Sequence, residues 1–188
     1  MFNKKKVITS VVLIGITLVV FVFVIPLPEK MLCLEPVKVP SQGKASQAKA
    51  AVYVPIADKE SGFAISYIHS VNKGLVTDFY SITQENNLII KTSRFYSYGA
   101  GMPEPADQPG QVFVETEEYL EMQNINRQMP FLLMAVGVIA NHKVYIPERN
   151  STLDLAEWFI PQTRLKISYK SLTFFKYILN TKRKVLNG

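Results

Sequence analysis

The sequence predicts a mainly β protein: a single β-sandwich or partly open barrel domain behind an N-terminal transmembrane helix. Short runs rich in β-branched and aromatic residues recur from residue 52 to residue 170, each bounded by Gly, Pro, Asn or Asp, which is typical of strands and turns. Hydrophobic residues make up 48% of the 188 residues, which favours one packed core over disorder. A long uncharged segment precedes these runs and predicts the helix.

The N-terminus divides into a basic tail, residues 1–6, and a predicted transmembrane anchor, residues 7–25. The anchor has no charged residue, and as a helix it would span roughly 28 Å, close to the thickness of a hydrocarbon core. Lys4, Lys5 and Lys6 favour a cytoplasmic N-terminus, so we expect a single-pass cell-membrane protein whose C-terminal domain lies outside the cytoplasm. The alternative is a cleaved secretion signal, although no small-x-small cleavage site follows the segment.

Residues 26–51 are predicted to be a tether with a first strand near residues 31–35, because "PVKVPSQGKASQAKAA" contains hardly any large apolar residue. Cys33 is the only cysteine, which excludes an internal disulfide and a cysteine metal site. Its leucine neighbours favour a small apolar residue at the start of that strand.

Residues 52–170 form the predicted extracytoplasmic β domain. In "GFAISYIHSV", alternate residues from Phe63 to Val71 carry the larger side chains, so that face is expected to point to the core. The segment "VETEEYLEMQNINRQ" is the place where a short helix is expected. The expected strands lie in the runs "AVYVPI", "GFAISYIHSV", "LVTDFYSI", "NLIIKTSRFYSY", "QVFVET", "AVGVIANHKVYI" and "TRLKISYK".

The net charge of +6 is confined to the two ends of the chain. Residues 158–188 carry seven basic groups and no acid, whereas residues 7–157 carry more acidic than basic groups. The folded body therefore lacks the basic excess that a nucleic-acid-binding face requires. The basic aromatic tail, residues 171–188, has two interpretations: a segment that rests on anionic headgroups, or a final strand or helix that packs on the domain.

Several blocks of the sequence occur together: "FAISYIHSV", "VTDFY", "RFYSYGAGMP", "GVIANHKVYI" and "LDLAEWFIPQTRLKISY". With these blocks the chain resembles an uncharacterised bacterial family, domain of unknown function eighteen-fifty, from about Leu32 to Tyr169. The family's proteins are small envelope proteins that are often encoded beside TAXI-type TRAP transporters, which import organic solutes. The resemblance therefore implies an interaction module that is accessory to such a transporter, with components of the TRAP transporter as partners. Its pattern falls on Tyr67, His69, Ser70, Val71, Asp78, Ser97, Tyr98, Gly99, Ala100, Gly101 and Pro103.

The first two blocks are expected to form a hairpin, because "NKG" at residues 72–74 is a turn signal. A two-residue loop would place Asp78 opposite Tyr67, on the face that also carries His69. A three-residue loop would place Asp78 opposite Ile68, facing away from His69. The sequence leaves both registers open.

The residue chemistry of these blocks favours a structural or recognition corner over a catalytic centre. Adjacent His69 and Ser70 on one strand would point to opposite faces, so they cannot form a base–nucleophile pair. No metal-ligand spacing is present, and neither a metal nor another cofactor is expected. We expect the His69 ring to bond Asp78 or the backbone of residues 97–101. The predicted corner consists of Tyr67, His69, Ser70, Asp78, Tyr98, Gly99, Gly101 and Pro103.

Two functions are carried forward from the sequence. The first is the membrane-anchored accessory module, which would contact lipid through residues 7–25 and could accept a small organic acid where Gly99 and Gly101 expose backbone amides. The alternative is a hydrolase-like envelope enzyme built around His69.

Overall fold

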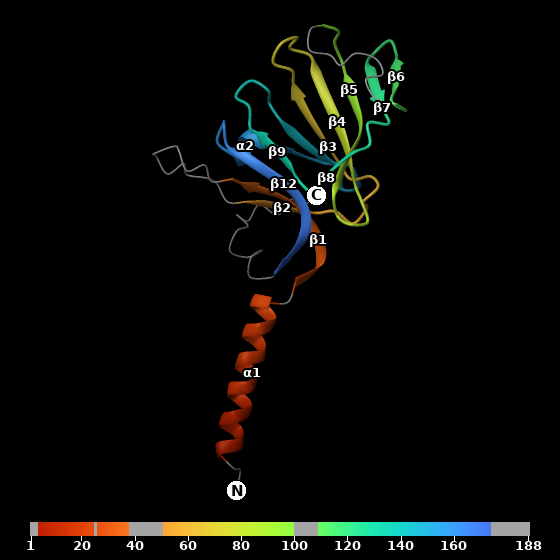
Figure 1. Cartoon of the computed structure of the whole chain (residues 1–188). Coiled ribbons are helices and arrows are strands. Elements are labelled where there is room, and N and C mark those ends of the chain that lie inside the picture. Colours follow the sequence, from red (N-terminus) through yellow and green to blue (C-terminus); the bar gives the residue numbers. More distant parts are fainter. Residues whose placement is uncertain (1–3, 25, 38–50, 100–108, 174–188) are drawn as a thin grey trace.

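A computed structural model of the chain describes residues 4–24, 26–37, 51–99 and 109–173 (Figure 1). Its first element is helix α1 (Lys4–Val24), which projects away from the β domain. The large apolar side chains from Ile8 to Val20 are exposed on this helix. The predicted anchor, residues 7–25, is helical as far as Val24. Among the described residues, no helix has both the length and the apolar character that crossing a membrane requires.

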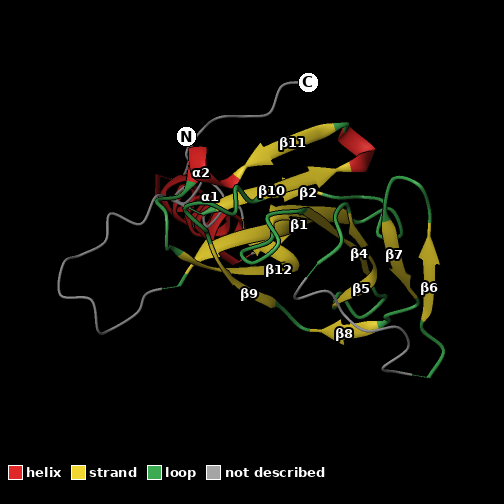
Figure 2. Ribbon diagram, turned by 90° about the horizontal axis from the view of Figure 1, so that it is seen from above, coloured by secondary structure: helices red, strands yellow, loops and turns green. Residues whose placement is uncertain are grey.

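The described β domain consists of two antiparallel sheets (Figures 1 and 2). The smaller sheet has the order β2 (Val52–Pro55), β1 (Pro26–Pro36), β12 (Arg164–Thr173) and β9 (Leu132–Ala135). The larger sheet has the order β11 (Ser151–Asp154), β10 (Lys143–Ile146), β3 (Phe63–Ile68), β4 (Leu75–Ile82), β5 (Leu88–Phe95), β7 (Leu120–Gln123) and β6 (Val112–Glu115), with β8 (Arg127–Met129) also paired to β5. Two short helical turns, η1 (Pro147–Arg149) and α2 (Leu155–Trp158), flank β11.

The core lies between the two sheets, as the alternation of apolar residues predicts. The Phe63 and Tyr80 rings stack across β3 and β4 with their centroids 5.0 Å apart, on the side of the larger sheet that faces the smaller one. The prediction of a mainly β fold is confirmed, and the described strands form two sheets that do not close into a barrel. The core side chains include Leu32, Leu34, Val54, Leu165 and Ile167 from the smaller sheet and Phe63, Ile65, Tyr80, Ile82, Leu88, Ile90, Val144, Ile146 and Leu153 from the larger one.

The first strand is longer and more central than the sequence predicted. Strand β1 begins at Pro26, directly after α1, and pairs with β2 on one side and β12 on the other. Cys33 is buried in β1 beside Met31, Tyr53 and Leu172, which form a second, smaller apolar cluster. Residues 26–36 are therefore an integral part of the β domain.

Two other expectations are wrong. The segment at residues 114–128 contains strands β7 and β8 where a helix was expected. The Thr116 side chain accepts hydrogen bonds from the Glu118 and Tyr119 amides, so the acidic residues lie in a turn between β6 and β7. The run at residues 135–146 is also not continuous, because residues 136–142 form a loop between β9 and β10.

Candidate functional site

The β3–β4 hairpin has neither of the two predicted registers. Tyr67 lies opposite Val76, and Asp78 lies opposite Ile65. The His69 amide donates to the Gly74 carbonyl at 2.8 Å, so the loop between these two residues is longer than expected. Lys73 adopts the left-handed conformation with φ of 58°, and its amide donates back to the His69 carbonyl. The turn signal was read correctly as a turn, but it did not fix the loop length.

The His69 ring is part of this turn. Its Nδ1 accepts hydrogen bonds from the amides of Val71 at 3.3 Å and Asn72 at 3.4 Å. This is the geometry of a side chain that caps its own loop. Among the described residues, the ring bonds these two amides and neither Asp78 nor the backbone of residues 97–99; residues 100 and 101, the rest of the expected 97–101 backbone, lie outside the described residues. Ser70 is exposed, and its carbonyl accepts from the Lys73 ammonium at 2.6 Å.

The hairpin loop packs closely on the "SYG" segment that the resemblance singled out. The Tyr96 amide donates to the Leu75 carbonyl at 3.0 Å. A Cβ added at Gly74 would lie 1.7 Å from the Ser97 Oγ, so this contact admits only glycine without displacement. Gly99 lies beside Asn72. The two blocks are therefore adjacent in space, as a single corner requires.

The rest of the corner is partly described. The Tyr98 side chain is exposed, and its hydroxyl donates to the Glu115 carboxylate, a hydrogen bond that raises the pKa of Tyr98. Gly101 and Pro103 lie outside the described residues, as does Ala100.

Asp78 lies on the core-facing side of the larger sheet, in a partly buried position. The Ser93 hydroxyl, from β5, donates to its carboxylate at 2.6 Å. Burial raises the pKa of Asp78, and the Ser93 hydrogen bond and the positive charge of Arg127 only partly oppose this effect. Tyr67, on the same face, has a pKa raised to about 12 by burial and by the nearby Asp78 charge. A partly buried carboxyl whose charged form is disfavoured is typical of binding and catalytic sites as well as of structural networks.

His142 joins this group, although it is not one of the predicted corner residues. Its ring lies against the Tyr67 ring with 5.6 Å between centroids, and its Nδ1 accepts from the Gly137 amide at 3.1 Å. Burial lowers the pKa of His142. The placement depends on the pairing of β10 with β3, which sets Lys143 opposite Ser66. No local pattern in the sequence signals this pairing.

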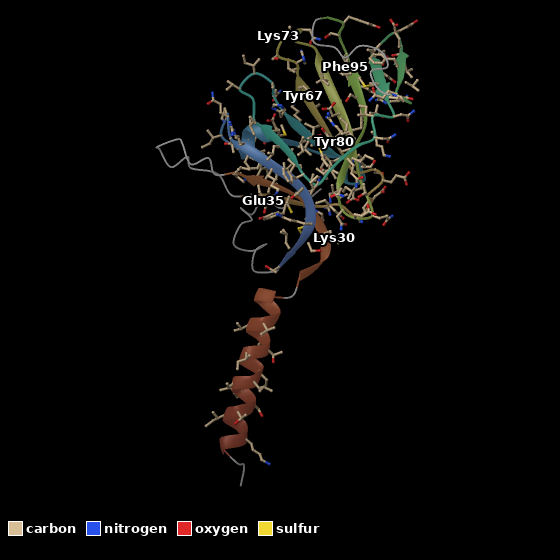
Figure 3. The ribbon with its side chains drawn as sticks, in the orientation of Figure 1. Lys30, Glu35, Tyr67, Lys73, Tyr80 and Phe95 are labelled. Atoms are coloured by element: carbon tan, nitrogen blue, oxygen red, sulfur yellow. The ribbon has the colours of Figure 1, made fainter. Side chains whose placement is uncertain are left out.

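Two neighbouring loops form a surface that we call the distal rim: residues 69–74, at the end of the domain furthest from α1, and residues 137–141, beside β9 (Figure 1). The Ile68 amide donates to the Ala140 carbonyl at 2.7 Å and joins the two loops. Lys73 marks the position of the rim in Figure 3. Val71, Val138 and Ile139 are 61%, 69% and 72% exposed, so the rim presents apolar side chains to its surroundings.

The outer face of the larger sheet carries a separate group that the sequence analysis also missed. Arg94 forms an ion pair with the buried Glu121, and its guanidinium lies 4.9 Å from the Phe79 ring centroid and 4.7 Å from that of Tyr119. Burial alone would raise the pKa of Glu121, but the hydrogen bonds from Arg94 and Gln123 lower it below its usual value. The alternation of the β5 and β7 residues is the signal that would have placed these residues on one face. Arg94, on β5, thus links β4 through Phe79 and β7 through Glu121.

The described residues contain no group of three or more His, Cys, Asp or Glu side chains that could hold a metal ion. The hydrogen bonds of His69 fix the turn, and the partly buried carboxyl of Asp78 lies on the neighbouring strand β4. The Nδ1 lone pair of His69 is directed at two backbone amides, so this nitrogen cannot at the same time accept a proton from a substrate.

About half of the chain is similar to a known protein family. Residues 63–153 match a family model described as Domain of unknown function (DUF1850). The match begins at the first residue of β3 and ends within β11. It thus contains β3 to β10, most of β11, the hairpin and the distal rim, and it leaves out β1, β2 and β12. The resemblance seen in the sequence is confirmed over this narrower range. No curated protein and no solved structure matches the chain.

Proposed function

We propose that this protein is a membrane-anchored extracytoplasmic interaction module, and that its distal rim contacts a partner protein. The observation that carries the proposal is the exposure of Val71, Val138 and Ile139 on two loops joined by a backbone hydrogen bond. Exposed apolar side chains that gather at one end of a domain are typical of protein contacts, because burying them against a partner removes apolar surface from water.

The anchor is residues 7–25, of which residues 7–24 belong to α1. This part of the proposal rests on the sequence: the segment has no charge, and three lysines precede it. The exposed apolar side chains of α1 support it, since the described part of the helix is not covered by the β domain. With α1 in the membrane, residues 69–74 of the distal rim would lie at the end of the domain furthest from the bilayer, where a second envelope protein can reach them.

The partner that the family resemblance favours is a component of a TAXI-type TRAP transporter. In this account the protein is an accessory to solute import and has no chemistry of its own. The geometry of His69 supports a recognition role over the hydrolase-like alternative, because its Nδ1 already serves the turn.

Capture from solubilised membranes tests the docking surface. The full-length tagged protein should retain its partner, and the double variant Val71→Asp/Ile139→Asp should lose it. The matched control is Leu133→Asp, a similarly exposed apolar position on β9 outside the rim. Equal capture by the wild-type protein and the rim variant would refute the proposal, as would equal loss in the control.

The orientation is tested separately. Protease added to intact spheroplasts should remove a C-terminal tag from the full-length protein, because the domain lies outside the cytoplasm. A tag that survives until the membrane is broken would contradict the proposed topology.

A further inference from the structure

A basic cleft lies at the side of the β domain nearest to α1, away from the distal rim. It has a volume of about 400 Å³ and forms where β1, the loop after β2, η1 and β12 meet. Lys30, on β1, marks its position beside the helix end of the domain (Figure 3). Its lining residues are Lys30, Pro55, Ile56, Ala57, Lys59, Glu148, Arg149 and Tyr169.

Two lysine ammonium groups of the cleft lie close together. The Nζ atoms of Lys30 and Lys59 donate to the same oxygen, Oδ1 of Asn86, at 3.0 and 3.1 Å. The Lys59 ammonium also lies 3.4 Å from the carbonyl oxygens of Thr83 and Gln84. All of these acceptors are neutral, so the hydrogen bonds do not cancel the repulsion between the two positive charges.

Acidic groups near the cleft do not neutralise these lysines. Among the described residues, neither Lys30 nor Lys59 has a carboxylate oxygen within 4.0 Å. Glu85, in the same turn as Asn86, is exposed and forms no ion pair with another described residue within 4.0 Å, although hydrogen bonds from its own backbone and, to a lesser degree, the charge of Lys59 lower its pKa. The Glu148 carboxylate lines the cleft, yet it accepts from the amides of Ala57 and Asp58 at 2.9 and 2.7 Å. Among the described residues, the hydrogen-bond acceptors of the two ammonium groups are therefore neutral, and the cleft keeps a net positive character at Lys30 and Lys59.

The wall of the cleft is fixed by hydrogen bonds. The Tyr169 hydroxyl donates to the Ile56 carbonyl at 2.6 Å, and the Arg149 Nε donates to the Pro55 carbonyl at 3.1 Å. Together with Glu148, these contacts hold the loop after β2 against η1 and β12. The two lysines thus project beside a wall that needs little rearrangement when a ligand binds, which lowers the entropic cost of binding.

We propose that this cleft binds a phosphate group between the ammonium groups of Lys30 and Lys59, with Arg149 at its edge. Phosphate has several acceptor oxygens and can bond two or three cationic donors at once, which matches this arrangement better than a single carboxylate does. The phosphate of an anionic lipid headgroup is the natural source, because the cleft lies at the α1 side of the domain. That source rests on the proposed membrane anchor, whereas the phosphate site itself does not.

The test uses the full chain in micelles of an uncharged detergent, at constant ionic strength, with thermal unfolding as the readout. Three probes are titrated: inorganic phosphate, dihexanoyl phosphatidylglycerol and dihexanoyl phosphatidylcholine. A ligand that binds the folded state raises the unfolding temperature in a saturable way. We expect saturation with phosphatidylglycerol and, for Lys30→Gln, an apparent affinity at least about tenfold weaker, since a charge-assisted hydrogen bond is worth about 1.5 kcal/mol or more.

Two further variants separate the site from general charge and folding effects. Lys91→Gln removes another lysine that donates to an asparagine side chain, Asn126, and should keep the wild-type affinity within about twofold because it lies outside the cleft. Lys30→Arg keeps the charge and should bind more tightly than Lys30→Gln. If inorganic phosphate also gives a saturable shift, this would support the site and show that it binds free phosphate as well as the phosphate of a lipid headgroup.

The absence of a saturable shift with both phosphate and phosphatidylglycerol would overturn the proposal. So would an equal loss in Lys30→Gln and Lys91→Gln, or a phosphatidylcholine response that equals the phosphatidylglycerol response and survives Lys30→Gln. Partner capture by the distal rim does not involve Lys30. If the Lys30→Gln protein no longer binds phosphatidylglycerol but still captures the partner, the proposed function is therefore unaffected.

Discussion

The Ser93 hydroxyl donates a 2.6 Å hydrogen bond to the Asp78 carboxylate between the adjacent strands β4 and β5, on the side of the sheet that faces the core. Burial disfavours the charged carboxylate more than Ser93 and Arg127 favour it, so the pKa of Asp78 is raised. A charged residue kept at a position that disfavours its charge lowers stability, which is common where a residue is retained for function.

Asp78→Asn should therefore raise the free energy of unfolding at pH 7 by on the order of 1 kcal/mol, because the amide keeps an acceptor for Ser93 and removes the buried charge. Urea unfolding of the full chain in micelles measures this change. A lower stability in the variant at pH 7 would show that the charged form is favoured in the fold.

The same substitution predicts a pH dependence. The pKa of Asp78 is higher in the folded protein than in the unfolded chain. The Asp78 carboxyl therefore contributes its full stabilisation when the pH lies below the unfolded pKa of about 3.9, and this stabilisation is lost as the pH rises through the folded pKa. The stability gap between Asp78→Asn and wild type should open with rising pH and close in acid. Asp58→Asn is the control of opposite sign, since a hydrogen bond from Ser61 lowers the pKa of Asp58.

His69→Ala should cost about 1 kcal/mol, because the Val71 and Asn72 amides lose their acceptor in the turn. His69→Asn should recover part of this loss, since an asparagine carbonyl can accept from amides two and three residues along the chain. Ser70→Ala, at an exposed position, should change stability by less than about 0.5 kcal/mol. Chemical denaturation of the three variants checks the order, and a His69→Ala variant as stable as Ser70→Ala would contradict the capping role.

Gly74→Ala should destabilise the protein by roughly 1–3 kcal/mol, because the new methyl group collides with the Ser97 side chain. The double variant Gly74→Ala/Ser97→Gly removes the collision and should regain most of the loss. A double-mutant cycle of unfolding free energies measures the coupling between the two positions. Additive effects would mean that the hairpin loop and the "SYG" segment do not pack together.

Arg94→Met should cost about 2 kcal/mol, since it leaves the buried Glu121 carboxylate without its cation, although partial exposure of Arg94 reduces the effect. Glu121→Gln should cost less, because an amide oxygen can still accept from Arg94. The Glu121 pKa is lowered in the fold, so its contribution is present above the unfolded value of about 4.3 and is lost as pH falls through the folded value. Unfolding curves between pH 3 and pH 7 should show the two variants converging toward wild type in acid; a constant difference would contradict the ion pair.

The strands were largely predictable because their alternating apolar residues occupy both sides of the core. The run "LVTDFYSI" became β4 with the same bounds, and Phe63 and Ile65 point to the core as expected. The expectation held only as far as Tyr67, because the chain turns at His69 and leaves Val71 exposed. A periodic pattern cannot show where a turn interrupts it.

The site was less predictable because it depends on contacts between distant segments. His142 and Tyr67 are far apart in the sequence, and only the pairing of β10 with β3 brings their rings into contact. This contact could therefore not be predicted from a local pattern. The partner of Asp78 was missed because Ser93 belongs to a strand whose register with β4 includes a bulge near Phe79. The basic cleft likewise combines Lys30, Lys59 and Arg149 from three separate elements.

Site-specific photo-crosslinking in intact cells tests the proposed docking surface most directly. A photoreactive amino acid at Ile139, on the distal rim, should yield one specific adduct with an envelope protein, and mass spectrometry should identify a solute-transporter component. The same amino acid at Leu133, similarly exposed on β9, should yield none. Crosslinking at Leu133 but not at Ile139, or no protein adduct at Ile139 in cells that express the transporter, would contradict the account.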